Sequence, residues 1–212
     1  MISAVLTLVF IIVACPQRDP VSQTGWYTVK TVLDGDTVIL SDNRRVRYLG
    51  IDTPELGRDG KAGQPFSRKA RDINASLVKG VEISLSFEQD RQDRYGRLLA
   101  YVSNKQGVVV NLELIRRGVA FYLADASQER TYDREMLAIQ RAAMKGRVGM
   151  WQNWQEPPVP EDGYVGNRRS RRFHHPDCHE GDKISPHNRQ RLASQWRALY
   201  EGFAPARGCM AP

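Results

Sequence analysis

The chain has 212 residues, of which 41% are hydrophobic and 26% are charged. This length supplies one core of ordinary size and a small second module, and it excludes a large multidomain assembly. The 31 Lys and Arg residues outnumber the 24 Asp and Glu residues, so the formal net charge is +7. Such a balance favours polyanionic partners, either nucleic acid or an anionic membrane surface, although a well-solvated surface alone would also carry it.

Residues 2–14 form an uncharged apolar run at the start of the chain. The run is shorter than the ~20 residues that span a bilayer, and it matches the hydrophobic region of a secretory signal. It ends in Ala14-Cys15, which resembles the cleavage and acylation site of bacterial lipoproteins. We therefore expect residues 1–15 to be a signal, the protein to be exported, and Cys15 to carry a lipid anchor in the bacterial cell envelope. The start of the chain, Met1-Ile2-Ser3, lacks the Lys or Arg of a typical signal. An ordinary cleaved signal, giving a periplasmic or secreted protein, and an uncleaved anchor therefore stay open as alternatives.

Two polar segments divide the rest of the chain. Residues 16–25 are polar and contain two prolines, and residues 155–163 contain three prolines among acidic residues. Both compositions are typical of linkers. We expect one domain over residues 26–154 and a small accessory module over residues 164–212.

The hydrophobic pattern of the first domain predicts short strands and three helices. Alternation of apolar and polar residues indicates half-buried antiparallel strands, and apolar residues at helical spacing indicate amphipathic helices. In chain order, the expected elements are a strand at 38–40, a strand at 46–50, a helix at 66–77, a strand at 81–87, a strand at 98–102, a helix at 111–117 that stops at Gly118, and a helix at 132–143 before Gly146. Short strands punctuated by glycine with a helix inserted among them predict an α+β fold, a small closed barrel of the oligonucleotide-binding (OB) type.

The accessory module is expected to be a small α+β unit. Residues from Tyr164 onward suggest a hairpin, and Ser194 is a suitable N-cap for a helix at 195–201 that Gly202 ends. About fifty residues give a marginal core. The module is therefore expected to need a metal, a disulfide or docking onto the barrel.

Three clusters of acids and arginines follow one another, at residues 34–37, 45–55 and 93–97. Each has a plain structural explanation: a turn, a strand end followed by a capping turn, and a charged hairpin tip. Together they contain hard oxygen ligands for a divalent cation, a base that could activate water, and guanidinium groups for phosphate charge. These are the groups that phosphodiester cleavage requires. Spacing alone does not bring Asp36 to Asp52.

In their order and internal spacing, the clusters resemble those of the staphylococcal, or micrococcal, thermonuclease family over about residues 26–154. The resemblance implies a five-stranded OB barrel with three helices, and calcium-dependent hydrolysis of DNA and RNA. It also implies that the carboxylates of Asp36 and Asp52 and the backbone carbonyl of Thr53 bind the calcium ion, with Asp34 as an acid beside these ligands.

The resemblance further assigns the catalytic groups. Glu55 takes the position of the proposed general base, and Arg47 and Arg97 match the two arginines that hold the scissile phosphate. Tyr95 matches a tyrosine of the nucleotide pocket. Two further tyrosines of the family's base pocket have no counterpart, because their places fall near Ala124 and Ala126. Two interpretations of Tyr122 stay open: it takes the place of these base-pocket tyrosines, or it is an aromatic residue of the core beside the barrel.

The accessory module resembles the small zinc-binding domain of a bacterial DNA-alkylation-repair methyltransferase. The similarity rests on His174, Cys178 and Cys209, but the first cysteine of the closing Cys-x2-Cys motif is Ala206 here. Three ligands would leave a structural zinc in need of His175, His179 or water, since such sites normally have four. A disulfide between Cys178 and Cys209 is the alternative in an exported protein.

Four arginines flank Ser170 at the start of the module: Arg168, Arg169, Arg171 and Arg172. They form either a solvated basic edge or a contact for the phosphate backbone. The sequence thus predicts an exported, calcium-dependent nuclease, expected to be a monomer without an obligate protein partner. The alternatives are a catalytically weak nucleic-acid-binding module tethered at the cell envelope and a membrane-tethered structural or DNA-uptake protein that works through its tail.

Overall fold

The computed structural model describes residues 21–22, 25–57, 60, 62–125, 129–206 and 208–209. The predicted signal at residues 1–15 and the lipid anchor at Cys15 lie outside these residues. Within them, no helix has both the length and the apolar character that crossing a bilayer requires.

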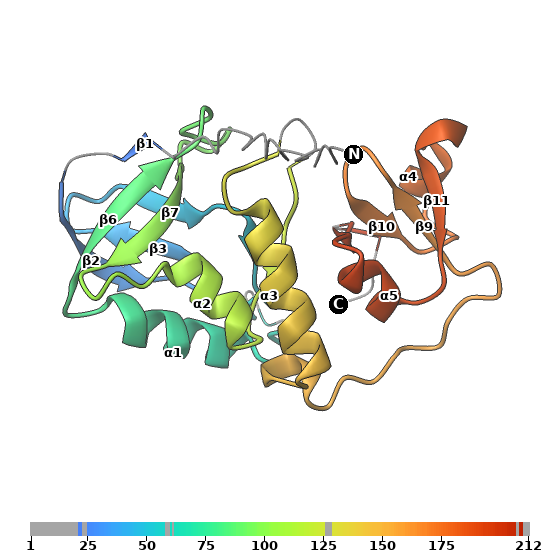
Figure 1. The fold of residues 1–212 in the computed structure, drawn as a ribbon, viewed down its shortest axis with the longest axis horizontal. Coiled ribbons are helices and arrows are strands. Elements are labelled where there is room, and N and C mark those ends of the chain that lie inside the picture. Colours follow the sequence, from blue (N-terminus) through green and yellow to red (C-terminus); the bar gives the residue numbers. More distant parts are fainter. Residues whose placement is uncertain are drawn as a thin grey trace, which may run out of the picture.

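The first domain is a closed barrel, confirming the predicted OB-type α+β fold (Figure 1). Among the described residues its five strands are β2 (Tyr27–Val32), β3 (Thr37–Leu40), β4 (Arg45–Tyr48), β6 (Glu82–Phe87) and β7 (Leu98–Asn104). They pair in the order β6-β2-β3-β4-β7, and a further pairing of β6 with β7 closes the ring. The β4–β7 pair is parallel and the other pairs are antiparallel. Closure leaves no barrel edge unpaired.

One short strand lies in the segment that was expected to be a linker. Residues of β1 (Val21–Ser22) pair antiparallel with β6, with Val21 opposite Phe87. The chain therefore pairs with the C-terminal end of β6, at Ser86 and Phe87, just before β2 pairs with the start of the same strand at Glu82 and Ile83.

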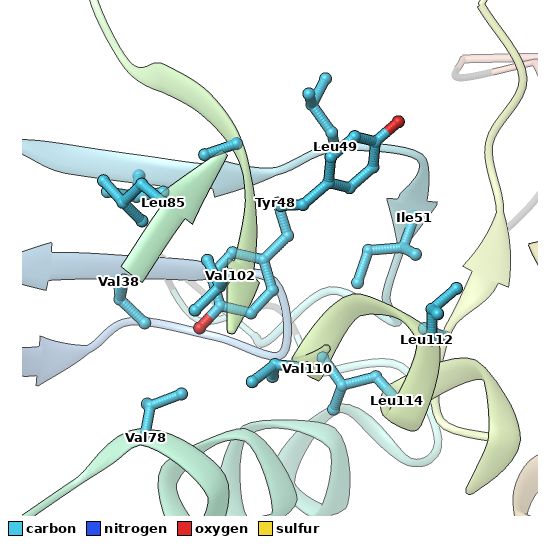
Figure 2. Close-up of a cluster of buried hydrophobic side chains, with 14 of the residues drawn as sticks. Val38, Tyr48, Leu49, Ile51, Val78, Leu85, Val102, Val110, Leu112 and Leu114 are labelled. Atoms are coloured by element: carbon cyan, nitrogen blue, oxygen red, sulfur yellow. The ribbon is translucent and has the colours of Figure 1, made fainter. Parts of the chain in front are cut away.

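Three helices cover the barrel, as predicted: α1 (Ser67–Val78), α2 (Val110–Arg116) and α3 (Asp133–Lys145). Figure 2 shows Val38, Leu85 and Val102 from the strands facing Val78 of α1 and Leu114 of α2. All these side chains are fully buried. Each such residue stabilises the fold by roughly 1.5–3 kcal/mol relative to an exposed one.

A buried asparagine at the start of α2 ties the helix to the strands that carry the predicted site. The Asn111 Nδ2 donates to the carbonyls of Leu49 (2.9 Å) and Ala100 (3.3 Å), and its Oδ1 accepts from the backbone N–H of Val102 (2.9 Å). These bonds fix the chain between β4 and β5 (Ile51–Asp52), which pairs antiparallel with β8 (Phe121–Tyr122). The position of Asp52 is thereby set by the core.

Gly118 ends α2, as the sequence predicts, for a steric reason. Its φ is +61°, and a Cβ there would lie 2.2 Å from the carbonyl oxygen of Val148. The neighbouring chain leads into the short 3₁₀ helix η1 (Gly149–Trp151).

The accessory module contains a separate four-stranded sheet within the described residues. Its strands are β9 (Tyr164–Asn167), β10 (Arg172–His174), β11 (Arg189–Leu192) and β12 (Ala204–Pro205), in the order β11-β9-β10-β12. Its helical elements are α4 (His179–Asp182), η2 (Pro186–Asn188) and α5 (Gln195–Tyr200). The Ser194 Oγ accepts from the backbone N–H of Arg197 (3.0 Å), which confirms the predicted N-cap of α5.

The module packs against α3 through α5 (Figure 1). The Gln140 Nε2 donates to the Leu199 carbonyl (2.6 Å), and the Arg141 Nε donates to the Tyr200 carbonyl (2.8 Å). The rings of Trp151 and Trp196 meet edge to face at 5.8 Å. The small module thus completes its core by docking onto the barrel domain.

Candidate active site

A hollow of about 330 Å³ on the side of the barrel collects residues from all three sequence clusters. Of the predicted site residues, Asp34, Asp36, Arg47, Thr53, Glu55, Tyr95 and Arg97 line it. Asp52 does not line this hollow; it pairs with the Arg47 guanidinium and lines a neighbouring cleft.

Strand register brings the first two clusters together. In the antiparallel pair of β3 and β4, Thr37 lies opposite Arg47, and the backbone N–H of Tyr48 donates to the Asp36 carbonyl (2.8 Å). Asp36 therefore lies beside Arg47 although eleven positions separate them along the chain. The connection that follows β4 returns Asp52 and Thr53 to the same place.

Arg47 stands between the two predicted metal-binding carboxylates. Its Nη2 lies 3.1 Å from Asp36 Oδ2 and 2.7 Å from Asp52 Oδ1. Its Nη1 donates to the carbonyls of Tyr48 (3.0 Å) and Ile51 (2.9 Å). Both carboxylates thus converge on a single cationic nitrogen, and the buried guanidinium is fixed in place by the backbone.

Asp36 is the most enclosed acid of the site. Its Oδ2 accepts from the backbone N–H and the hydroxyl of Thr53, each at 3.0 Å, and its Oδ1 accepts from the Thr37 hydroxyl (3.0 Å). Burial raises the pKa of Asp36 above its usual value of 3.8, while the charge of Arg47 opposes the rise. Asp34 adds a nearby negative charge, and its Oδ1 accepts from the backbone N–H of Asp36 (3.0 Å).

The third cluster forms a tight turn that orients Arg97. The Asp93 Oδ2 accepts from Arg97 Nε and pairs with Arg97 Nη2, each at 2.7 Å. The Asp93 Oδ1 accepts from the backbone N–H groups of Tyr95 and Arg97. Burial alone would raise the pKa of Asp93, but these hydrogen bonds and the Arg97 charge outweigh it and lower the pKa below 3.8. Tyr95 is 68% exposed, so its ring is available to a ligand.

Glu55 lies at the rim of the hollow, on an exposed segment. Its backbone is held by Gln64, whose Oε1 accepts from the Glu55 N–H (2.7 Å) and whose N–H donates to the Glu55 carbonyl (2.9 Å). The carboxylate is therefore on a fixed stretch of chain and within reach of solvent, as a proton acceptor must be.

The charges lining the site fit a divalent cation. Asp34, Asp36, Asp52 and Glu55 contribute four carboxylates around the single buried guanidinium of Arg47. Carboxylate and carbonyl oxygens are the ligands that calcium prefers, in flexible geometry. The carboxylate and carbonyl oxygens present are thus suited to calcium.

Two residues that the sequence analysis did not single out also belong to the site. Arg45 lines the hollow, and Asp93 holds Arg97. Arg45 precedes Arg47 by two positions in β4, so period-2 alternation places both on one face of the strand and could have indicated it.

Tyr122 does not replace the missing base-pocket tyrosines. It is only 6% exposed and packs in the barrel core, which explains its aromatic character without a ligand. Ala124 is also buried, and Ala126 lies outside the described residues.

In the accessory module, Cys178 and Cys209 form a disulfide, one of the two alternatives from the sequence. His174 lies beside it, with Nδ1 3.4 Å from Cys209 Sγ. These three residues are close enough for a metal site, which neither His175 nor His179 joins among the described residues. A metal would need the cysteine thiolates, so the disulfide and a metal exclude each other.

In one hollow the OB-type barrel gathers the buried Asp36, the rim Glu55 and the guanidinium groups of Arg47 and Arg97. These are the groups that hydrolysis of a phosphodiester bond requires, so the site has the composition of a nuclease site. The family model of the staphylococcal nuclease homologues matches residues 45–153, and the chain belongs to this family.

Curated relatives agree with the assignment. Endonuclease YncB of Bacillus subtilis is 32% identical over 145 residues, which cover 66% of this chain and 64% of that protein. The thermonuclease of Staphylococcus intermedius is 31% identical over 132 residues, which cover 59% of this chain and 76% of that protein. An uncharacterized endonuclease of Escherichia coli is 33% identical over 135 residues, which cover 62% of this chain and 79% of that protein. The chain thus spans slightly less than two thirds of the Bacillus protein and about three quarters of the other two.

Proposed function

We propose that this chain hydrolyses phosphodiester bonds of DNA and RNA in a calcium-dependent reaction in which water is the nucleophile. The observation that carries the proposal is the convergence of Asp36 and Asp52 on the Arg47 guanidinium, at 3.1 and 2.7 Å. The printed names of the relatives, an endonuclease and a thermonuclease, support the same activity.

Asp36, Asp52 and the carbonyl of Thr53 would hold the calcium ion. When bound, calcium would supply Lewis-acid polarisation of the phosphate and charge stabilisation for the attacking water. The hydrogen bonds from Thr37 and Thr53 to Asp36 keep that carboxylate oriented. They also favour its ionised form, which is the form that binds a cation.

Residues of the chain itself carry out proton transfer, stabilise the transition state and position the catalytic groups. Glu55 accepts the proton from water as the water oxygen bonds to phosphorus and the bond to the leaving sugar oxygen breaks. The leaving sugar oxygen takes up a proton from solvent and departs as a hydroxyl group. Arg97 and Arg47 stabilise the negative charge that grows on the phosphate oxygens. Asp93 acts through Arg97, since its two bonds at 2.7 Å fix the direction of that guanidinium.

The activity test compares hydrolysis of DNA and RNA with calcium and with a chelator. We expect cleavage with calcium, loss with the chelator, and loss in Asp36→Asn. The matched control is Asp42→Asn, an exposed aspartate in the β3–β4 turn that pairs with Arg44 and not with the site. Binding of oligonucleotides without hydrolysis under any metal condition would instead favour the tethered binding module.

We also propose that the protein is exported and anchored through Cys15, on the basis of the apolar run at residues 2–14. Mass measurement of the native protein tests this directly. A chain that starts at an acylated Cys15 supports the anchor, and a chain that retains residues 1–14 contradicts it.

A further inference from the structure

A second, larger cleft of about 620 Å³ lies between the barrel and the accessory module. The barrel wall includes Leu99, Leu123 and Arg130, and the module wall includes Ser170, Arg172 and Pro205. The cleft exists only because the module docks where it does, so it is not a property of the barrel alone.

The cleft is continuous with the candidate active site through its arginines. Arg47 and Arg97 line both the cleft and the smaller hollow, whereas Glu55 and Tyr95 line only the hollow. A phosphate held by these two arginines therefore has the hollow on one side and the cleft on the other. A nucleic acid chain bound through that phosphate has to continue in both directions.

The module wall is rigidly held beside the barrel. Arg172 donates from Nη1 and Nη2 to the Ala124 carbonyl across the cleft, both at 3.3 Å. Glu156 accepts from the backbone N–H groups of Gln195 and Trp196 at the start of α5. Together with the α3–α5 contacts, these bonds keep the wall in one position, as binding without a large ordering cost requires.

Ser170 is presented to the cleft by a fixed turn. The Asn167 Oδ1 accepts from the backbone N–H groups of Arg169 (3.0 Å) and Ser170 (3.2 Å), and the Arg171 N–H donates to the Asn167 carbonyl (2.8 Å). The exposed Arg168 and Arg169 lie on the same turn.

The residues that line the cleft are better suited to the sugar and base of a nucleotide than to several consecutive phosphate groups. Four arginines in the cleft face an equal number of acidic residues, and Asp52 and Asp93 are paired with Arg47 and Arg97. Net charge is therefore balanced. Partly exposed apolar surfaces of Leu99, Leu123 and Pro205 remain for contact with a base. A volume within ~300–1,000 Å³ encloses one ligand of modest size, which corresponds to a short stretch of a single strand.

We propose that this cleft binds the nucleotides that flank the cleaved phosphate on the side away from Tyr95, with the accessory module as one wall. The inference rests on the proposed nuclease function and adds a substrate-binding site formed jointly by the two domains. It assigns the module a direct part in holding single-stranded substrate.

The test places a bulky carboxylate on the module wall with Ser170→Glu and a neutral side chain of the same size with Ser170→Gln. The control is Ala193→Glu, which adds the same carboxylate at an exposed position of the module that does not line the cleft. Each protein is assayed on a single-stranded octanucleotide and on bis(p-nitrophenyl) phosphate, a small diester that carries no flanking nucleotides. Thermal unfolding verifies that the variants are folded.

We expect Ser170→Glu to raise KM for the octanucleotide about tenfold, the effect of ~1.4 kcal/mol of lost binding, with kcat and hydrolysis of the small diester unchanged. If Ser170→Gln also raises KM for the octanucleotide, the result supports occupancy of the cleft by substrate. If only Ser170→Glu raises this KM, the result supports binding of substrate in the cleft with a phosphate close to residue 170. If both Ser170 variants match Ala193→Glu on both substrates, the inference is wrong. If the parent protein hydrolyses neither substrate, the proposed function fails instead.

Discussion

Replacing Arg97 with lysine keeps a positive charge in the site but removes the planar, two-pronged donor. In the structure, Arg97 uses Nε and Nη2 together on Asp93 Oδ2, each at 2.7 Å, and its side chain is 29% exposed. A lysine ammonium is a compact point charge and cannot bind Asp93 in this way and also direct a second prong toward phosphate.

The stability cost of Arg97→Lys is small and the catalytic cost is large. The ion pair is partly exposed, so its weakening lowers the free energy of unfolding by about 1 kcal/mol or less. Loss of one charge-stabilising donor in a site of this kind typically lowers the rate ~10²–10³-fold, and we expect kcat to fall by this factor. The matched control is Arg91→Lys, an exposed arginine that precedes the same turn and stacks on Phe87.

The assay measures kcat and KM on a single-stranded oligonucleotide, with urea unfolding of each protein in parallel. We expect Arg91→Lys to match the parent in both measurements. A folded Arg97→Lys protein with near-parental turnover would refute the role given to the guanidinium.

Three further predictions follow from buried and paired groups. Asn111→Ala removes the side-chain partner of the Leu49 carbonyl and of the Val102 N–H in the core, whereas the Ala100 carbonyl keeps the Leu49 N–H (2.9 Å). Urea unfolding should therefore show a loss of about 3 kcal/mol in the free energy of unfolding; a loss under 1 kcal/mol would contradict the bridging role. Because the pKa of Asp93 is lowered, its stabilising effect is full at neutral pH and is lost as the pH falls below its usual value of 3.8. The difference in unfolding free energy between the parent and Asp93→Asn should therefore shrink in acid, and a difference that is constant with pH would oppose the assignment. Cys178→Ser removes a disulfide that spans 31 positions and should lower the free energy of unfolding by ~3–4 kcal/mol. Unfolding of the oxidised parent and of the variant measures this difference. Equal stability of the two proteins would show that docking alone stabilises the module.

Local sequence signals predicted most of the elements. The helices α1, α2 and α3 follow from apolar spacing and from the glycines that end them, because these signals act within one or two turns. The strand β2 was not predicted. Its side chains are mostly exposed or half-buried, with Val29 as its buried residue, so the alternation that marks the other strands is weak there.

The assembly of the site depended on information that local patterns do not contain. The β3–β4 register, which places Thr37 opposite Arg47, brings Asp36 beside the arginine. The Asn111 bridge fixes the chain ahead of Asp52. Both are long-range contacts of the core. The family resemblance supplied the grouping, while the separation of Asp52 from the main hollow appeared only in the structure.

The docked position of the module was the least predictable feature. The small size of the module predicted that it needs a metal, a disulfide or docking onto the barrel. Composition does not show which surface of the barrel domain the module would contact. Gln140, which anchors α5 from within α3, lies buried among apolar residues and carries no sequence signal of a partner fifty-nine positions away. The larger cleft follows from this docking.

Calorimetric titration of the purified protein with calcium tests the central claim most directly, because it measures the cation site without requiring turnover. We expect one ion bound per chain, loss of that binding in Asp36→Asn, and parental binding in Asp42→Asn. Absence of calcium binding by the parent, or binding unaffected by Asp36→Asn, would contradict it.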